Sequence, residues 1–342
     1  MKVRKLLRIH STRLFPVRLG AHQYKITGIA SKCDWVVLSD LKQPHIELRK
    51  QRNSQRPETI YLSLRAPIHA LDYFVRVVLP SLTHPFILIS GSEDFTLPRQ
   101  IDKRFLDRNT LAHRYVNIIL NHQFLRHWTV ENLDDNQHPK LRPLPLGMLL
   151  EHTKDNEDVI EIPDTANLLS RPLRALSAHR VRAHAQWDTR KRVTKLVKQD
   201  WSDWCTSLES EISEDKYLKL LGKYSFVLCV EGGGLDPSPK AWQAILHGAI
   251  PIIKKNALSQ CYQQLPVIFI DDWHANALSH QKLEQFRSKL SYYYDTEAGR
   301  RDTLKRLSLD YWWRYAIRPA NRPTKTEAAH STPPAEQAAN GI

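Results

Sequence analysis

The stretch C-V-E-G-G-G-L-D-P-S-P-K-A-W-Q-A-I-L-H-G-A-I-P-I-I, residues 229–253, decides the fold because it reads as strand, loop, helix and strand in succession. Glycine is scarce in this chain, with 11 in 342 residues, yet three glycines stand together here. An apolar run ends at Val230, and Glu231 then opens a loop made of Gly232, Gly233 and Gly234. Because glycine has no side chain, this loop lets the backbone approach a ligand closely.

The helix after this loop begins in a way that favours an anion. Ser238 is a good N-cap, and Pro239 falls at the first helical position, where its missing N–H costs nothing. Lys240 lies in the first turn, where a cation opposes the positive end of the helix dipole. A bound phosphate would remove that conflict and use the free N–H groups. The pattern indicates a pyrophosphate site at the carboxyl edge of a parallel sheet.

A tight turn with a solvated lysine is the alternative for this segment, and the residues leave both interpretations open. The spacing matches neither a Walker A motif nor G-x-G-x-x-G. A P-loop NTPase and a dinucleotide-dependent dehydrogenase are therefore both disfavoured.

Outward from this segment, short apolar runs alternate with amphipathic ones, which predicts βαβ units and an α/β fold with parallel sheets. The strand-like runs are 34–39, 59–64, 85–91, 224–230, 249–253 and 266–271. The length of the chain favours two domains. An acidic, polar stretch at 154–164 places the boundary, so we expect domains at 1–160 and 161–318. Residues 319–342 are rich in Pro, Ala and polar residues, which predicts a disordered tail.

The composition is that of a soluble globular protein, with 42% hydrophobic and 25% charged residues. No apolar run is long enough for a transmembrane helix, and no secretory signal is expected. The four cysteines are widely spaced, which favours buried thiols in a reducing compartment and disfavours structural zinc. We therefore expect a cytoplasmic protein.

The net charge of +14 comes from two segments. Residues 1–18 hold six Lys and Arg and no acid, whereas residues 171–198 hold nine against one Asp. Partners that carry phosphates, anionic lipid or acidic sugars are all compatible with this pattern. Apolar residues interleave with the N-terminal bases, so a weak contact with an anionic membrane surface is expected.

Two acids follow the predicted strand that ends at Gly91. Glu93 and Asp94 stand in a loop at a sheet edge, where a carboxylate can act as a general base. The alternative is that they are turn or N-cap acids. Successive residues leaving a strand point to opposite sides, so one of the two is expected to face the site.

At these residues the chain resembles the exostosin-like glycosyltransferases, in which a glycine-containing loop, an Asp, a basic residue, an aromatic and a G-x-I-P strand follow one another. The matching residues are Gly232, Gly233, Gly234, Asp236, Lys240, Trp242 and G-A-I-P-I at 248–252. Further similar segments lie at 87–98, 265–273 and 311–313. Two more are 127–134, which contains Trp-x-x-x-Asn, and 141–153, which contains Pro-x-Gly. The resemblance therefore covers residues 85–315. Pro-Ser-Pro-Lys at 237–240 replaces the His-Arg of many relatives. The Glu, Lys and Trp also resemble the donor motif of α1,3-fucosyltransferases.

Both families imply a GT-B architecture, in which two Rossmann-like domains face each other across a cleft and a late helix packs back on the N-terminal domain. The implied function is transfer of a sugar from a nucleotide-diphosphate sugar to a hydroxyl acceptor, such as a glycan. Asp94 is the expected base, with Glu93 second, and no metal or cofactor is expected to be obligatory. The expected donor-binding residues are Glu231, Gly232, Gly233, Gly234, Asp236, Ser238, Lys240, and Arg180 or Arg182.

The alternative function is a basic α/β protein that binds nucleic acid or another polyanion without catalysis. Its support is a sequence pI near 9.6. RNP aromatics, a zinc module and a helix-turn-helix are all missing from the sequence, so a nucleic-acid partner is disfavoured.

Overall fold

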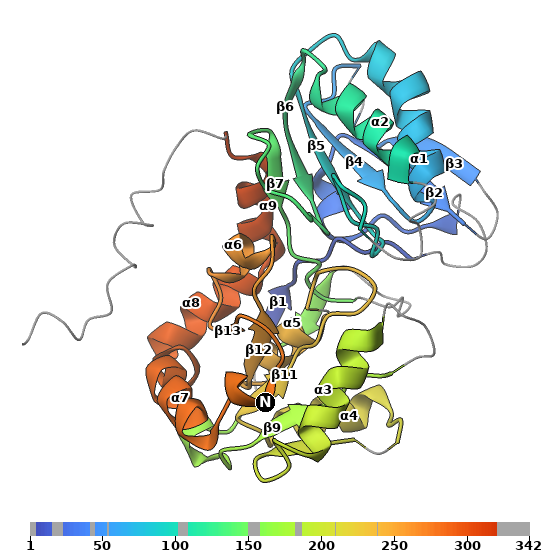
Figure 1. Ribbon diagram of the computed structural model, residues 1–342. Helices are drawn as coiled ribbons and strands as arrows, with labels where there is room; N and C mark the ends of the chain where they lie inside the picture. The colour runs from blue at the N-terminus through green and yellow to red at the C-terminus, as the bar shows by residue number, and fades with distance from the viewer. Residues whose placement is uncertain are drawn as a thin grey trace, which may run out of the picture.

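The computed structural model describes residues 5–15, 23–41, 45–52, 55–101, 109–149, 158–181, 187–208, 210–237 and 239–319. Arg182, Ser238, part of the expected boundary at 154–164 and the expected tail beyond Ala320 lie outside these residues. The remainder forms two α/β halves, each built on its own sheet (Figure 1).

The N-terminal sheet has six strands, of which all but the edge strand β3 run parallel to their neighbours. The other five strands lie side by side in the order in which they occur in the chain. The apolar runs expected to be buried strands are β2, β4 and β5, whose residues are all buried. In spatial order the strands are β3 (His45–Lys50), β2 (Trp35–Asp40), β4 (Thr59–Ser63), β5 (Phe86–Gly91), β6 (Leu125–Val130) and β7 (Leu141–Pro143).

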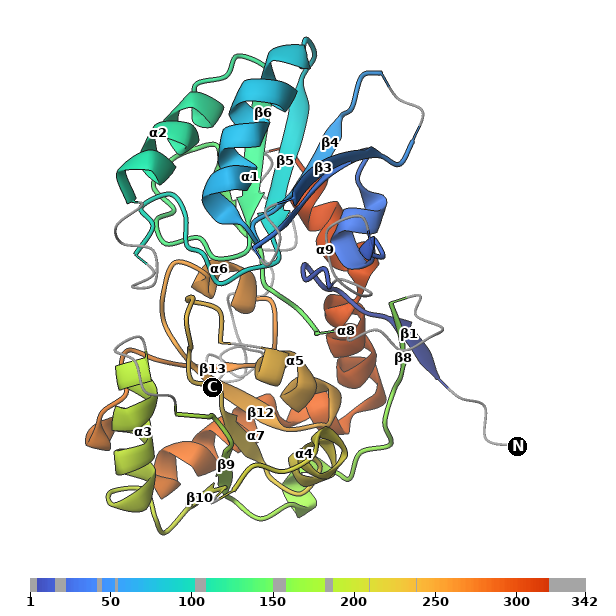
Figure 2. The same ribbon diagram turned by 90° about the vertical axis from the view of Figure 1, so that its right-hand side faces the viewer.

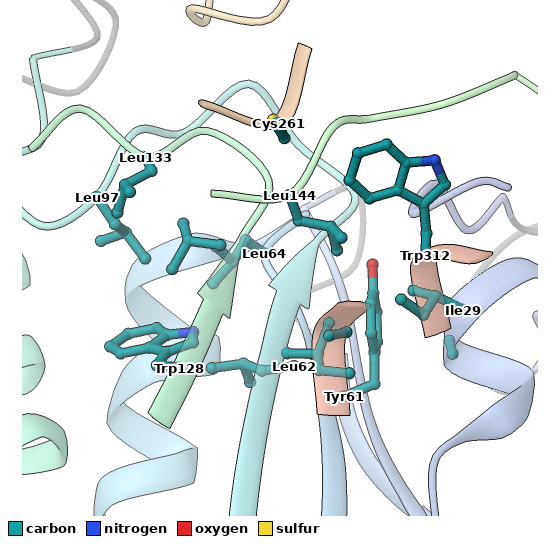
Figure 3. Packing of buried hydrophobic residues seen from close by; sticks show 14 of the residues in the cluster. Ile29, Tyr61, Leu62, Leu64, Leu97, Trp128, Leu133, Leu144, Cys261 and Trp312 are labelled. Carbon is teal, nitrogen blue, oxygen red and sulfur yellow. The ribbon is translucent and has the colours of Figure 1, made fainter. Parts of the chain in front are cut away.

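Helices cover both faces of this sheet. On one face lie α2 (Asn109–Leu120) and α1 (Pro67–Tyr73), which continues into a π-helix at Phe74–Val78 and a 3₁₀ turn at Leu79–Ser81. On the other face lie the 3₁₀ helix Gly28–Lys32 and α9 (Leu309–Ile317). Figure 3 shows Trp128 on one side of the strands and Tyr61 with Trp312 on the other.

The return of the late helix to the N-terminal half is confirmed. The Ala316 carbonyl lies 2.7 Å from Nε2 of His127 on β6 and accepts the hydroxyl of Thr129. Burial lowers the pKa of His127 to about 4 against the opposing effect of this hydrogen bond, so the ring is neutral at pH 7.

The C-terminal sheet has five parallel strands in the order β10, β9, β11, β12, β13. The bounds are β9 (Ala175–Ser177), β10 (Cys205–Ser207), β11 (Phe226–Leu228), β12 (Ile250–Lys254) and β13 (Ile268–Ile270). The first strand thus lies between the second and the third, and the direction of winding reverses between β9 and β11. This reversal is a topological switch point, where open α/β sheets bind their ligands.

In the described ranges, six further α-helices belong to this half (Figure 2). Ser213 caps α4 and Thr296 caps α8 by accepting the N–H groups of Lys216 and Gly299. The bounds are α3 (Asp188–Lys198), α4 (Glu214–Leu221), α5 (Pro239–Leu246), α6 (Ser259–Tyr262), α7 (His280–Asp295) and α8 (Glu297–Leu307). The expectation of an α/β fold with two parallel-sheet, Rossmann-like halves is therefore confirmed.

One hydrophobic core runs through both halves. It joins the N-terminal sheet to Trp242 of α5, Tyr262 of α6 and Trp312 of α9. The ring of the buried His10 lies 6.1 Å from that of Trp242 and 5.7 Å from that of Trp312. The N-terminal segment holds this junction, since β1 (Leu6–Arg8) pairs with β8 (Val159–Glu161) and the His10 N–H donates to the Leu307 carbonyl.

Gly147 is required where the Pro-x-Gly segment crosses this junction. Its φ is +80°, and a Cβ there would lie 2.4 Å from the His10 carbonyl oxygen. We expect Gly147→Ala to lower the free energy of unfolding by at least about 2 kcal/mol, because both the backbone strain and the contact with a backbone atom are unfavourable.

Gly222→Ala is the matched control for this prediction. Gly222 has a φ of −66°, and the nearest atom to an added Cβ is 3.6 Å away. Its effect should stay within about 1 kcal/mol. Urea unfolding of both variants measures the difference, and equal stabilities would contradict the role assigned to Gly147.

Candidate functional site

The switch point of the C-terminal sheet gathers positive charge. His179 and Arg180 follow β9, and Lys240 lies in the first turn of α5, which follows β11. The pKa of the half-buried Lys240 is lowered to about 8, first by burial and then by the charges of Arg190 and Arg180. Three cations are thus close enough to repel one another at the edge where a ligand is expected.

Arg190 of α3 shapes this edge. Its guanidinium donates to the carbonyls of Glu231 at 3.1 Å, Val230 at 3.3 Å and Arg180 at 3.3 Å. It also lies over the ring of Trp187, 4.7 Å from the centroid. The sequence places Arg190 among nine similar basic residues, and nothing in its spacing separates it from the others.

The glycine loop, residues 231–236, packs tightly at both ends. A Cβ at Gly232 would lie 2.8 Å from Nη2 of Arg190, and one at Gly234 would lie 2.5 Å from Oδ1 of Asn132. Gly234 also approaches the carbonyl oxygen of Asp94, at 2.9 Å from the added Cβ. Glycine is therefore needed here for packing, besides any approach of a ligand.

The two acids of the glycine loop are occupied by protein partners. Glu231 pairs with Lys254 at 3.0 Å and accepts the indole N–H of Trp273 at 3.0 Å. Asp236 is buried and accepts the Leu146 N–H at 2.9 Å and the Tyr262 hydroxyl at 3.0 Å. Both side chains fix the shape of the loop, and their roles as donor contacts stay predictions.

Across the junction, the acidic loop, residues 92–94, follows β5. Ser92 has a φ of +77°, which is strained for a residue with a side chain. The Glu93 carboxylate accepts the Asp94 N–H at 2.8 Å, as a turn acid does. Asp94 is about one-third exposed and pairs with Nη2 of Arg13 at 2.6 Å. Asp94 therefore forms an ion pair with Arg13, and the charge of Glu93 also acts on that guanidinium.

Arg13 also pairs with Glu131, at 2.8 Å, and so joins two carboxylates. Glu131 is only 1% exposed, and it accepts the Ser92 N–H at 2.7 Å and the Thr12 hydroxyl. Burial raises the pKa of Glu131 to about 7, against the opposing effects of Arg13 and these hydrogen bonds. Sequence reasoning missed both Arg13 and Glu131, whose only signal was the position of Glu131 next to Asn132 of the Trp-x-x-x-Asn segment.

Asn132 connects the two loops directly. Its Nδ2 donates to the Glu93 carbonyl at 3.1 Å. Its Oδ1 accepts the N–H groups of Leu235 at 2.9 Å and Asp236 at 3.1 Å. One amide therefore sets the position of the acidic loop relative to the glycine loop, and at Gly234 the two halves are in contact.

The basic segment 171–198 is divided in its roles. Arg171 and Arg174 donate to backbone carbonyls, as Arg190 does, and stabilise loops of the C-terminal half. Arg180 is 58% exposed and pairs with Glu211 at 3.1 Å. Several basic residues of this segment therefore stabilise the fold. Fewer of them are left to form a basic surface than the sequence suggests.

No three His, Cys, Asp or Glu side chains gather as metal ligands in the described part of the chain. None of the helices in the described ranges has the length and apolarity needed to cross a membrane.

Comparison with known proteins adds only distant structural likenesses. No family model and no curated protein matches the chain. The chain is similar to an α,α-trehalose-phosphate synthase (UDP-forming) from Burkholderia vietnamiensis, at 8% identity over 75% of this chain and 70% of that one, with a TM-score of 0.39. It is also similar to a spinosyn rhamnosyltransferase complexed with thymidine diphosphate, at 12% identity over 73% and 68%, with a TM-score of 0.32. These values are too low to support an argument about the site, which rests on its own geometry.

The raised pKa of Glu131 predicts a specific pH dependence of stability. Between pH 4.5 and about 7 the folded protein holds this proton and the unfolded chain does not, so the free energy of unfolding falls as pH rises. We expect Glu131 to contribute a loss of about 2 to 3 kcal/mol across this range in the wild type, a contribution that is absent from Glu131→Gln.

The difference between Glu131→Gln and the wild type, measured by urea unfolding at several pH values, isolates this contribution. Glu297→Gln, at a side chain that is 94% exposed, is the control and should follow the wild type. A Glu131→Gln curve parallel to the wild type from pH 4.5 to 7 would contradict the assignment.

Proposed function

We propose that the protein is a glycosyltransferase that moves a sugar from a nucleotide-diphosphate sugar to a hydroxyl acceptor, and that this acceptor is a glycan, as in the exostosin-like enzymes that the sequence resembles. The observation that carries the proposal is that Lys240, Arg190 and Arg180 gather at the switch point. The glycine loop at this site contacts the loop of Asp94 at Gly234. A cationic ligand edge and a carboxylate from the other half are the two parts that this reaction needs.

The donor diphosphate belongs at Lys240. Burial and the charges of two neighbouring guanidinium groups disfavour the cationic form of Lys240 in the first turn of α5. A diphosphate would pair with this charge and lie at the helix N-terminus. Gly232, Gly233 and Gly234 would let the loop backbone lie close to it.

The transfer step follows from the placement of Asp94. The acceptor hydroxyl oxygen attacks the anomeric carbon, the bond from that carbon to the donor phosphate oxygen breaks, and the hydroxyl proton passes to Asp94. Asp94 pairs with Nη2 of Arg13 at 2.6 Å before the step. The departing diphosphate takes the electron pair and is stabilised by Lys240, a role that fixed cations can fill without a metal ion.

Asn132 is a positioning residue in this proposal. It holds the acidic loop and the glycine loop at hydrogen-bond distance, so the base and the donor keep a fixed separation. Preorganised geometry of this kind contributes to catalysis because no reorganisation is needed during the reaction. A cytoplasmic location is part of the proposal, and it is supported by the four free, buried cysteines.

Lys240→Ala should weaken donor binding about 10- to 100-fold, because it removes a charge-assisted contact with phosphate. Thermal-shift screening against UDP-, GDP-, CDP- and dTDP-sugars first identifies the donor, since a ligand at 100 times its Kd adds about 2.7 kcal/mol of stability. Lys255→Ala is the matched control, because Lys255 pairs with Asp271 at the same sheet edge. Unchanged affinity of Lys240→Ala for the identified donor would contradict a phosphate contact.

The lowered pKa of Lys240 adds a pH test. Between pH 7 and 9 donor affinity of the wild type should fall as Lys240 loses its proton near pH 8. Lys240→Arg keeps its charge throughout and should lose this dependence. Parallel affinity profiles for the two proteins would place the titrating group elsewhere.

Asp94→Asn should lower turnover about 10²- to 10⁴-fold with donor affinity near the wild-type value. Glu93→Gln should keep most turnover, because its carbonyl oxygen can still accept the Asp94 N–H. Initial rates and donor titration of both variants test the assignment. Near-normal turnover of Asp94→Asn would show that the base lies elsewhere, while the donor site at Lys240 would stand.

A further inference from the structure

A half-open hollow of about 390 Å³ lies far from the candidate site, at the amino-terminal ends of the strands of the N-terminal sheet. Asp34, Thr59, Ile87 and Arg126 line it, and each lies within one residue of the start of a strand. Its volume falls within the range of small-ligand pockets, about 300–1,000 Å³. A second hollow of about 250 Å³ beside α7 is smaller than this range.

The charge of this hollow is positive where a ligand could reach it. Arg52, Arg56 and Arg126 are exposed and contribute to its lining. Asp34 is occupied, since its Oδ2 accepts the N–H groups of Glu58 and Thr59 and the Thr59 hydroxyl, each at 3.0 Å. Arg52 pairs with Asp34 at 3.5 Å. The Glu58 carboxylate also lines the hollow, so the lining holds three guanidinium groups and two carboxylates.

The far wall of the hollow is apolar. Trp313 and Ile317 lie one turn apart on α9, and both are half-buried. A half-buried indole offers a flat surface for a ring, while the guanidinium forks match the geometry of carboxylate, sulfate and phosphate. The hollow therefore combines a stacking surface with anion-binding groups.

We propose that this hollow is a second binding site, which takes an anionic group attached to a ring, as in an acidic oligosaccharide. The ring packs against Trp313 and Ile317, and the anion pairs with Arg126 and Arg52. β5 spans about 20 Å between this edge and Gly91, so the site is separate from the transfer step. The proposal goes beyond the proposed function, because it requires binding and no reaction.

Isothermal titration calorimetry on the full chain at low ionic strength tests the site. The probes are a sulfated hexasaccharide, an oligosaccharide of uronic acids, a neutral oligosaccharide of equal length and a mononucleotide. We expect the wild type to bind at least one acidic oligosaccharide and not the neutral one. Arg126→Ala and Trp313→Ala should each weaken that binding about tenfold or more.

Arg301→Ala is the control for nonspecific attraction of anions, since Arg301 is 75% exposed on α8 and pairs only weakly with Glu297. Its affinity should equal that of the wild type. Arg126→Lys separates charge from geometry and keeps the fold testable if Trp313→Ala unfolds; it should bind more weakly than the wild type.

The outcomes are distinct. Binding of the mononucleotide alone, with the same loss in Arg126→Ala, would support the anion site and identify the ring as a nucleotide. Equal binding of the neutral oligosaccharide, no binding of any probe, or binding that Arg126→Ala leaves unchanged would overturn the proposal. Lys240→Ala should not alter this binding, so failure here is distinguishable from failure of the donor site.

Discussion

The side-chain amide of Asn132 fixes the geometry on which the candidate site depends. It accepts two backbone N–H groups of the glycine loop and donates to the acidic loop, so a single planar group relates the two halves. Gly234 permits this approach, since any side chain there would collide with the amide. The contact is largely buried, where a hydrogen bond left unmade is expensive. The separation between Lys240 and Asp94 is thereby set by the fold before any ligand binds.

Much of the buried charge in the interior is offset by nearby partners. Around Arg13, two carboxylates and several hydrogen bonds offset one buried guanidinium. Around Arg171 and Arg190, backbone carbonyls do the same. At Lys240, burial and then the charges of Arg190 and Arg180 lower the pKa to about 8. Perturbed pKa values of this kind often mark functional sites, and this one coincides with the switch point of the sheet.

Much of this arrangement was predictable from local patterns. Continuous apolar runs gave β2, β4, β5, β11, β12 and β13, and the glycine loop and the start of α5 followed from residue types. The edge strand β3 and the short strands β7 and β10 were missed because three to six mixed residues carry little periodic signal. Arg13, Glu131 and Arg190 were missed for a different reason. Their roles come from contacts across 81, 118 and 41 positions, which no local spacing encodes.

The contacts of the two ends of the chain determine whether the molecule can be cut into two stable fragments. The strand β1 and His10 lie against β8 and the end of α8, whereas α9 covers a face of the N-terminal sheet. A cut between residues 160 and 161 would leave that sheet without its covering helix and would expose Trp242 and Tyr262 in the other fragment. Neither fragment would then be an independent folding unit. The two should regain structure only when they are mixed, because each half supplies part of the packing of the other.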